Sequence, residues 1–156
     1  MNFNKEGQTA LLSSFVHTLK QLSETAVRLT EAETAKANAA SAKEHEKMDS
    51  FLKEEQALLL KLRGLEQQRN RQAEELGWKD LTFRQILQKS DPETFSVLSP
   101  VFSELEQQLK NLTDAKDSAG RIISARLREF EHILGTGSSA SGLGADVSSH
   151  FHDRYV

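Results

Sequence analysis

The strongest structural signal in the chain is the stretch 48–76, which reads MDSFLKEEQALLLKLRGLEQQRNRQAEEL. Its apolar residues recur at steps of three and four, and this spacing places them on one side of an α-helix. Charged and amide side chains fill the opposite side. The stretch predicts an amphipathic helix of about 45 Å, at a rise of about 1.5 Å per residue. Because such a helix is stable in water only when its apolar side is covered, the rest of the chain must pack against it.

The composition favours long helices over a thick globular core. Of the 156 residues, 6% are aromatic, 37% are hydrophobic and 28% are charged, and there are two prolines. This balance is typical of elongated helical proteins. The net charge of −3, with both signs interleaved, creates no field that attracts nucleic acid or an anionic membrane. The lack of cysteine excludes disulfides, thiol nucleophiles and cysteine-based zinc sites.

No stretch of the sequence predicts export or membrane insertion. No apolar run approaches the roughly 20 residues that a membrane-spanning helix needs. The first residues, MNFNKEGQTALLSS, lack the basic start and the continuous apolar segment of a signal peptide. We therefore expect a soluble cytoplasmic protein.

A second amphipathic helix is predicted to begin at Thr9, after a short polar lead. Its apolar stripe is strong at first and thins to alanines beyond residue 30, which favour helix but bury little surface. The sequence Ser41-Ala42-Lys43-Glu44 matches a capping box, so we expect a turn over 38–41 and an antiparallel hairpin. The alternative is one unbroken helix over 9–76. We favour the hairpin because the unbroken helix would leave the alanine surface uncovered.

Turn signals follow the hairpin. Gly77 stands where a left-handed C-cap residue belongs, and Trp78 can fold over the end of the helix. Thr82-Phe83-Arg84-Gln85 matches a capping box that opens a short helix. Ser90-Asp91-Pro92 predicts the end of that helix and the start of another, with Asp91 as the cap and Pro92 in the first position.

The last predicted helix is long. Ser99-Pro100 predicts a break or kink near Leu98, so we expect the helix to run over about 100–134. The composition then becomes Gly/Ser-rich, which predicts a flexible C-terminal tail over 135–156. The predicted fold is all-α. A long antiparallel hairpin, a short helix and a long C-terminal helix form an elongated three- to four-helix bundle over 1–134.

Candidate catalytic and metal-binding residues are few. Glu129 and His132 form one E-x-x-H step, whereas a di-iron carboxylate bundle needs two such steps and further glutamates. His150, His152 and Asp153 lie in the predicted tail, where an incidental exposed pair of histidines is the simpler interpretation. No cluster of serine, histidine and acid stands out. We therefore expect no enzymatic activity, no metal and no cofactor.

Three arginines in the last helix, Arg121, Arg126 and Arg128, raise the question of phosphate contacts. Glu129 and Glu131 dilute their charge, and no aromatic residues lie between them to stack on bases. The arginines therefore predict a solvated helix face, and we expect no nucleic acid partner.

The end of the last helix offers a candidate binding surface for another protein. It follows a polar stretch, Asp114–Gly120, and carries a broad apolar face. Two interpretations remain open. The face belongs to the core, or it is left uncovered by its own chain and pairs with an amphipathic helix of a partner. The candidate partner-binding residues are Ile122, Ile123, Leu127, Phe130, Ile133 and Leu134.

Two segments carry a resemblance to a known family. One is Glu55-Gln56-Ala57-Leu58-Leu59-Leu60-Lys61-Leu62, followed by Leu65-Glu66 and Arg69; the other is Leu76-Gly77 with the segment 81–87. They resemble the second helix and the inter-helix connection of the flagellar type III export chaperones of the FlgN family, over about residues 8–135. The last helix departs from the family pattern. Lys116 and Ala119 stand where members often carry two asparagines, and Leu134 precedes Gly135 where many have an aromatic residue.

The resemblance implies a small cytoplasmic helical chaperone. It would bind the C-terminal helices of the hook–filament junction proteins, which are hook-associated proteins, prevent their premature assembly and present them to the flagellar export apparatus. The alternative is a self-associating helical structural or assembly protein without a client. Homo-oligomerisation stays open, because a self-paired stripe and a partner-paired stripe have the same pattern.

Overall fold

The computed structural model describes residues 2–134, which form four α-helices: α1 (Asn2–Ser41), α2 (His45–Glu75), α3 (Phe83–Lys89) and α4 (Pro92–Leu134). The all-α prediction is confirmed. Outside the described part lie residues 1 and 135–156, which include the predicted tail, and the side chains of residues 2–4, 123, 124, 126, 127 and 129–134.

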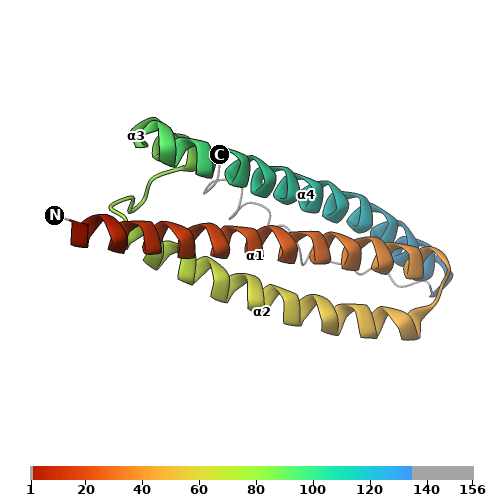
Figure 1. The fold of residues 1–156 in the computed structure, drawn as a ribbon. Helices are drawn as coiled ribbons and strands as arrows, with labels where there is room; N and C mark the ends of the chain where they lie inside the picture. The colour runs from red at the N-terminus through yellow and green to blue at the C-terminus, as the bar shows by residue number, and fades with distance from the viewer. Residues whose placement is uncertain (1, 135–156) are drawn as a thin grey trace.

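The three long helices form an elongated bundle (Figure 1). α1 and α2 make the predicted antiparallel hairpin, and α4 lies along α1 and runs in the same direction. α1 packs against both α2 and α4 and is therefore the central helix, while the short α3 packs against α4 near the start of α1. The alternative of one unbroken helix through the hairpin is wrong.

The turn between α1 and α2 is a Schellman motif built on Lys43. The amide of Glu44 donates to the carbonyl of Ala39 at 2.9 Å, and the amide of Lys43 donates to the carbonyl of Ala40 at 3.2 Å. Lys43 has a φ of 59°, a left-handed conformation that more often falls to glycine. The predicted capping box is wrong, because Ser41 ends α1 and Glu44 precedes α2 without a side-chain cap. A lysine in this role gives no turn signal, so the predicted turn lay slightly too early.

α1 begins earlier than the predicted start at Thr9. It starts at Asn2, and the hydroxyl of Thr9 donates to the carbonyl of Lys5 at 2.8 Å. Residues 5–10 are exposed, so this first part is held by local hydrogen bonds and not by burial. The apolar pattern could not reveal a helical segment that buries nothing.

The connection from α2 to α3 follows the predicted turn chemistry. Gly77 has a φ of 83°, and the amide of Trp78 donates to the carbonyl of Ala73 at 2.8 Å, which closes a second Schellman motif. Thr82 and Gln85 form the predicted capping box: the Gln85 amide donates to Thr82 Oγ1 at 3.2 Å, and the Thr82 amide donates to Gln85 Oε1 at 2.9 Å. These contacts fix the direction in which the chain enters α3.

α4 starts as predicted but is not interrupted by Pro100. Asp91 caps it by accepting a hydrogen bond from the Thr94 amide at 2.7 Å, and Pro92 is its first residue. This backbone hydrogen bond keeps the pKa of Asp91 below its ordinary value. Of the predicted break or kink near Leu98, the break is wrong, because α4 continues through Pro100 to Leu134.

Burial on both sides of Pro100 explains why the helix continues. A proline inside a helix costs about 3 kcal/mol and leaves the carbonyl four residues earlier without its partner. Here Pro100 and Ser96 are exposed, so water reaches that side of the helix. Leu98 is 0% exposed and Phe102 is 2% exposed, and their burial stabilises the helix on both sides of Pro100.

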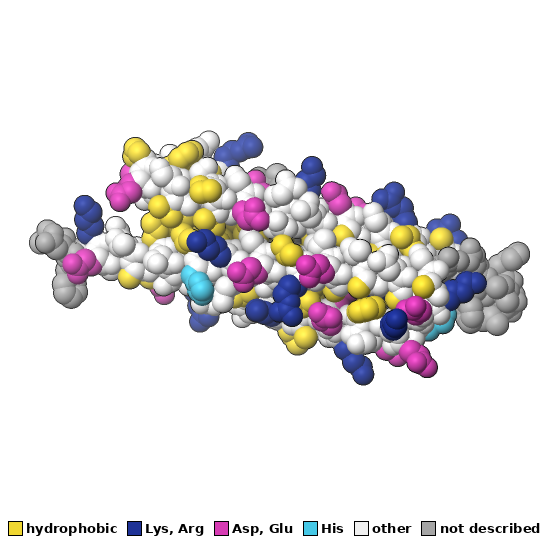
Figure 2. Space-filling model, turned by 45° about the vertical axis from the view of Figure 1, so that its right-hand side comes forward, with side chains coloured by type: hydrophobic (Ala, Val, Ile, Leu, Met, Phe, Trp, Pro, Cys, Tyr) yellow, Lys and Arg dark blue, Asp and Glu magenta, His cyan; other side chains and the backbone are white. Residues whose placement is uncertain are grey.

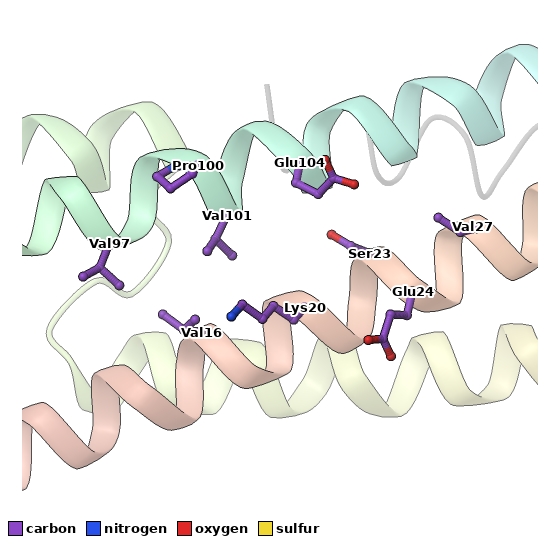
Figure 3. A pocket seen from close by; sticks show the side chains of 9 residues that line it. All are labelled: Val16, Lys20, Ser23, Glu24, Val27, Val97, Pro100, Val101 and Glu104. Atoms are coloured by element: carbon purple, nitrogen blue, oxygen red, sulfur yellow. The ribbon is translucent and has the colours of Figure 1, made fainter.

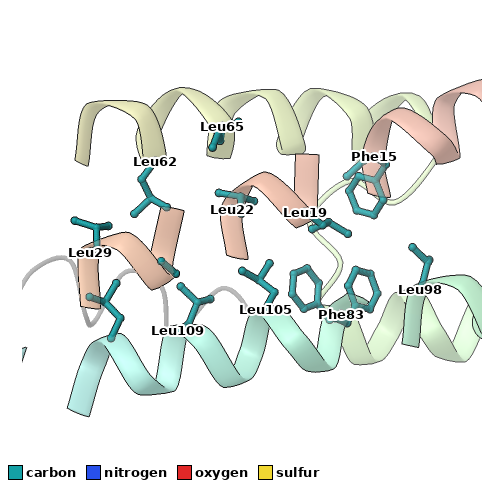
Figure 4. Packing of buried hydrophobic residues seen from close by; sticks show 14 of the residues in the cluster. Phe15, Leu19, Leu22, Leu29, Leu62, Leu65, Phe83, Leu98, Leu105 and Leu109 are labelled. Carbon is teal, nitrogen blue, oxygen red and sulfur yellow. The ribbon is translucent and has the colours of Figure 1, made fainter. Parts of the chain in front are cut away.

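The core runs along the inner faces of α1, α2 and α4 (Figure 4). Its largest side chains gather near α3: the rings of Phe83 and Phe102 stack with centroids 4.0 Å apart, and Phe15 meets Phe102 edge-on at 6.3 Å and Trp78 at 5.7 Å. Aromatic pairs of this kind contribute about 0.5–1.5 kcal/mol each beyond the buried area. The predicted apolar stripes supply most of the remaining core, which includes Leu19, Leu22, Ala26, Leu29, Leu58, Leu62, Leu65, Leu105, Leu109 and Leu112.

Candidate partner-binding surfaces

The predicted binding face on α4 begins where the described core ends. Along α4 the described buried residues are Leu98, Phe102, Leu105, Leu109, Leu112 and finally the small Ala119, which is 1% exposed. Ile122 follows one turn later and is 37% exposed. It is therefore one of the few large apolar side chains that the described chain leaves open to solvent.

The other members of this face, Ile123, Leu127, Phe130, Ile133 and Leu134, lie outside the residues whose side chains the structure describes. Their backbone belongs to α4, which is continuous to Leu134. A continuous helix keeps steps of three and four on one side. The helical backbone therefore keeps these positions at the spacing of one helix face.

A groove between α1 and α4 was not predicted from the sequence. It has a volume of about 580 Å³, and it lies on the side of the α1/α4 pair that α2 does not line (Figure 3). Its walls are mostly apolar, and Figure 2 shows hydrophobic side chains gathered between the start of α4 and the N-terminal half of α1. The lining residues are Val16, Lys20, Ser23, Glu24 and Val27 of α1 and Val97, Pro100, Val101 and Glu104 of α4.

A second hollow of about 350 Å³ lies between α3 and the start of α4. Phe95 is at its edge and is 46% exposed, while Phe83 and Phe102 form its floor with their buried rings. Arg84 and Glu106 also line the hollow, so its apolar area is small and mixed with charge.

The alanine-rich end of the hairpin contains an ionic cluster in place of large apolar side chains. Lys36 Nζ donates to Glu33 Oε1 at 3.2 Å and, across the hairpin, to Glu55 Oε2 at 2.8 Å. The three side chains are 12%, 4% and 14% exposed, in that order. The cluster therefore joins α1 to α2 in a place that water barely reaches.

Burial and mutual contact shift the pKa values in this cluster. Burial, together with hydrogen bonding to Glu55 and repulsion by it, raises the pKa of Glu33 to about 7. Burial alone would raise the pKa of Glu55, but hydrogen bonds with Glu33 and Lys36 and the charges of Lys36 and Lys116 lower it. Glu33 is therefore the member of the cluster that takes up a proton near neutral pH.

Several of the residues that carry the family resemblance are buried, while Gln56, Ala57, Leu60 and Lys61 are exposed. Leu58, Leu62 and Leu65 are core residues of α2, and Glu66 and Arg69 are each 5% exposed. Glu66 Oε1 accepts a hydrogen bond from Arg69 Nη2 at 3.0 Å, and the pair lies on a single turn of α2. These residues of the motif thus take part in the packing of α2.

The described residues offer no visible basis for metal binding. Among the residues whose side chains the structure describes, no group of three or more His, Asp or Glu is arranged to hold a metal ion. Glu129, His132, His150, His152 and Asp153 lie outside the residues whose side chains are described. Among the helices that the structure describes, none combines the length and the apolar character needed to cross a membrane.

The predicted solvated face of arginines is seen only in part. Arg121 and Arg128 are exposed, and Arg121 Nε donates to the carbonyl of Asp117 at 3.3 Å, one turn earlier in α4. The side chain of Arg126 lies outside the described part.

Comparison with known proteins agrees with the fold and with the resemblance. The family model described as FlgN protein matches residues 4–140, which span the four described helices apart from the first two residues of α1. Neither the curated proteins nor the solved structures gave a match. FlgN is a family of flagellar export chaperones and not of enzymes. Its model covers most of the chain, and this chain belongs to the FlgN family.

Proposed function

We propose that this chaperone binds the C-terminal helices of the hook–filament junction proteins in the cytoplasm. It keeps them from assembling prematurely and delivers them to the flagellar export apparatus. The client helix packs along the end of α4, against Ile122, Ile123, Leu127, Phe130, Ile133 and Leu134.

The observation that carries this proposal is the exposure of Ile122 directly after the last described core residue of α4. An isoleucine that is 37% exposed gains free energy when a partner covers it. The residues that follow at helical spacing are apolar too, so a client helix would find a continuous stripe. Membership of a chaperone family makes a protein client the expected partner.

The test is a binding titration with purified protein and the C-terminal segments of the hook–filament junction proteins from the same cell. Ile122→Asp places a charge in the proposed contact and should weaken binding about tenfold or more. Leu60→Asp is the matched control, because Leu60 is 68% exposed on α2 and far more open to solvent than Ile122. Isothermal titration calorimetry gives the affinities, and circular dichroism verifies that both variants keep their helices.

Equal affinity of both variants and the unchanged protein would place the client elsewhere. A loss of helix in the Ile122→Asp variant alone would assign this side chain to the core. If the unchanged protein bound none of these segments, the proposed clients would be wrong.

A further inference from the structure

α1 carries a second stripe besides the one that faces the core. Val16, Lys20, Ser23 and Val27 follow one another at steps of four, three and four, the spacing that aligns side chains along a helix pair. All four line the groove between α1 and α4 (Figure 3). The groove therefore presents side chains at the spacing that helix–helix packing uses.

The α1 side of the groove has two charged side chains, Lys20 and Glu24, that pair with no other described residue. Among the described residues, neither Lys20 nor Glu24 takes part in an ion pair, and Lys20 lies four residues before Glu24, the less favourable order on a helix. The Ser23 hydroxyl oxygen is buried without a hydrogen-bond partner, although Ser23 lies between these two charges. Of the polar side chains that line the groove, Glu104 accepts a hydrogen bond from Gln108, whereas Lys20, Ser23 and Glu24 have no partner among the described residues.

The stripe reads nearly the same in both directions. In an antiparallel pair of α1 helices, Val16 of the first copy lies opposite Val27 of the second. By symmetry, Val27 of the first copy lies opposite Val16 of the second. The same register brings Lys20 of each copy within about one residue of the level of Glu24 of the other. Two apolar contacts and two opposite-charge contacts thus arise together from one symmetric arrangement, as a two-fold interface requires.

We propose that the groove between α1 and α4 is a homodimer interface, in which the α1 helix of a second copy docks antiparallel. A different helix would have to present an acid to Lys20 and a base to Glu24, at this spacing and beside valines. The chain's own α1 does so when it is reversed. The inference does not depend on the proposed client site, which lies beyond residue 121 of α4.

Charge exchange tests this arrangement. Lys20→Glu and Glu24→Lys each place like charges opposite one another in the homodimer, so each variant alone should dimerise about tenfold more weakly or worse. Mixed together, the two variants should dimerise again, because every contact is then between opposite charges. Sedimentation equilibrium from about 1 µM to about 1 mM, with one variant carrying a fluorescent label, measures both effects.

Two controls keep the result specific. Lys61→Glu changes the net charge as Lys20→Glu does, but lies on an exposed part of α2, and should leave dimerisation unchanged. Ile122→Asp should also leave it unchanged, which separates this interface from the proposed client site.

A protein that stays monomeric to about 1 mM would overturn the proposal, and so would two variants that fail to dimerise when mixed. Loss of dimerisation in the Ile122→Asp variant would move the interface to the end of α4. Recovery in the mixture also excludes misfolding as the cause of the single-variant losses, because unfolded chains would not regain a dimer.

Discussion

The two ends of this bundle reach a closed interior by different means. At the aromatic end, which contains Phe15, Trp78, Phe83 and Phe102, large rings fill the space between α1, α3 and α4. At the ionic end, near the turn between α1 and α2, the interior contains alanines and the charged cluster around Lys36. Leu52, which belongs to this end of α2, is 39% exposed.

The contrast teaches where the stability of a long bundle comes from. Burying a ring removes much apolar area from water, while burying an alanine removes little. A buried ion pair offsets the cost of dehydrating its own charges and adds little beyond that. We therefore expect the aromatic end to hold the bundle together, and the ionic end to open locally at a lower free energy.

The largest expected effect lies at the aromatic end. Phe102→Ala removes the stacked contact with Phe83 and the edge contact with Phe15, and should lower the free energy of unfolding by about 3–5 kcal/mol. Phe95→Ala, at a ring that is 46% exposed, should cost less than about 1 kcal/mol. Urea denaturation of both variants measures the difference. Similar losses in the two would mean that the rings do not dominate this end.

The next effect breaks the ionic end. Lys36→Met keeps most of the side chain but leaves the carboxylates of Glu33 and Glu55 without their shared cation, and should cost about 2 kcal/mol. Lys47→Met is the control, because Lys47 pairs with Glu44 at 2.9 Å on the exposed surface, where the loss should stay within about 0.5 kcal/mol. Hydrogen exchange of the amides near the turn would show whether the ionic end opens more often. An equal cost for both substitutions would contradict a buried cluster.

The pH dependence of stability sharpens the comparison, because Glu33 has a pKa of about 7 in the folded chain against an ordinary value of 4.5. The folded chain thus binds a proton more tightly, so this contribution to stability is complete below pH 4.5 and disappears as the pH rises through 7. Between about pH 5 and pH 8 the unchanged protein should lose about 2–3 kcal/mol that Glu33→Gln does not lose. Urea midpoints at several pH values test this, and parallel curves would refute it.

Glu55 does not obscure that measurement. Its pKa is lowered in the folded chain, so its contribution is present above its ordinary value of 4.5 and is lost only as the pH falls further. Of the two carboxylates, Glu33 is therefore the one whose contribution changes above about pH 5, and Glu33→Gln isolates it.

The smallest effects compare the two Schellman turns, one at each end. Gly77→Ala should destabilise the chain by about 1 kcal/mol because Gly77 has a φ of 83°, although an added methyl group would meet no atom within 4 Å. Lys43→Gly should instead stabilise it by about 0.5 kcal/mol, since glycine adopts a φ of 59° without strain but loses more entropy on folding. Thermal unfolding of both variants gives the signs. Changes in the same direction would contradict this account.

The apolar spacing and the capping residues predicted most of the fold. The stripe from Phe15 to Leu29 is buried as expected. Thr82 and Asp91 cap the starts of α3 and α4, and Gly77 ends α2, each at its predicted position. Such features are local, because helical spacing and capping depend on residues within a few positions of one another. The all-α bundle was predictable for that reason.

The two errors have different physical causes. Pro100 lies inside a helix because burial of Leu98 and Phe102 outweighs its cost, which is an effect of tertiary packing. Lys43 is exposed and adopts a left-handed conformation in a local turn, where the sequence usually signals the turn with glycine.

The candidate binding surfaces could be predicted only in part from the sequence. Val16 and Val27 share a helical face, but Lys20 and Ser23 interrupt it, so the groove gave no apolar signal in the sequence. The pairing of Lys36 with Glu55 depends on the register of the hairpin, which the misplaced turn obscured. The sequence indicated Ile122 as a candidate but left a core position open, because an exposed apolar stripe and a buried one have the same spacing and differ only in what surrounds them.

The parallel course of α1 and α4 has a consequence for synthesis. The central helix α1 is made first. Phe102 of α4, whose ring meets that of Phe15, emerges from the ribosome only after α2 and α3. The hairpin can form early from near neighbours, but one side of α1 stays open until much later, since contacts distant in sequence form slowly. During that interval the nascent chain exposes apolar side chains of its central helix that the finished bundle buries.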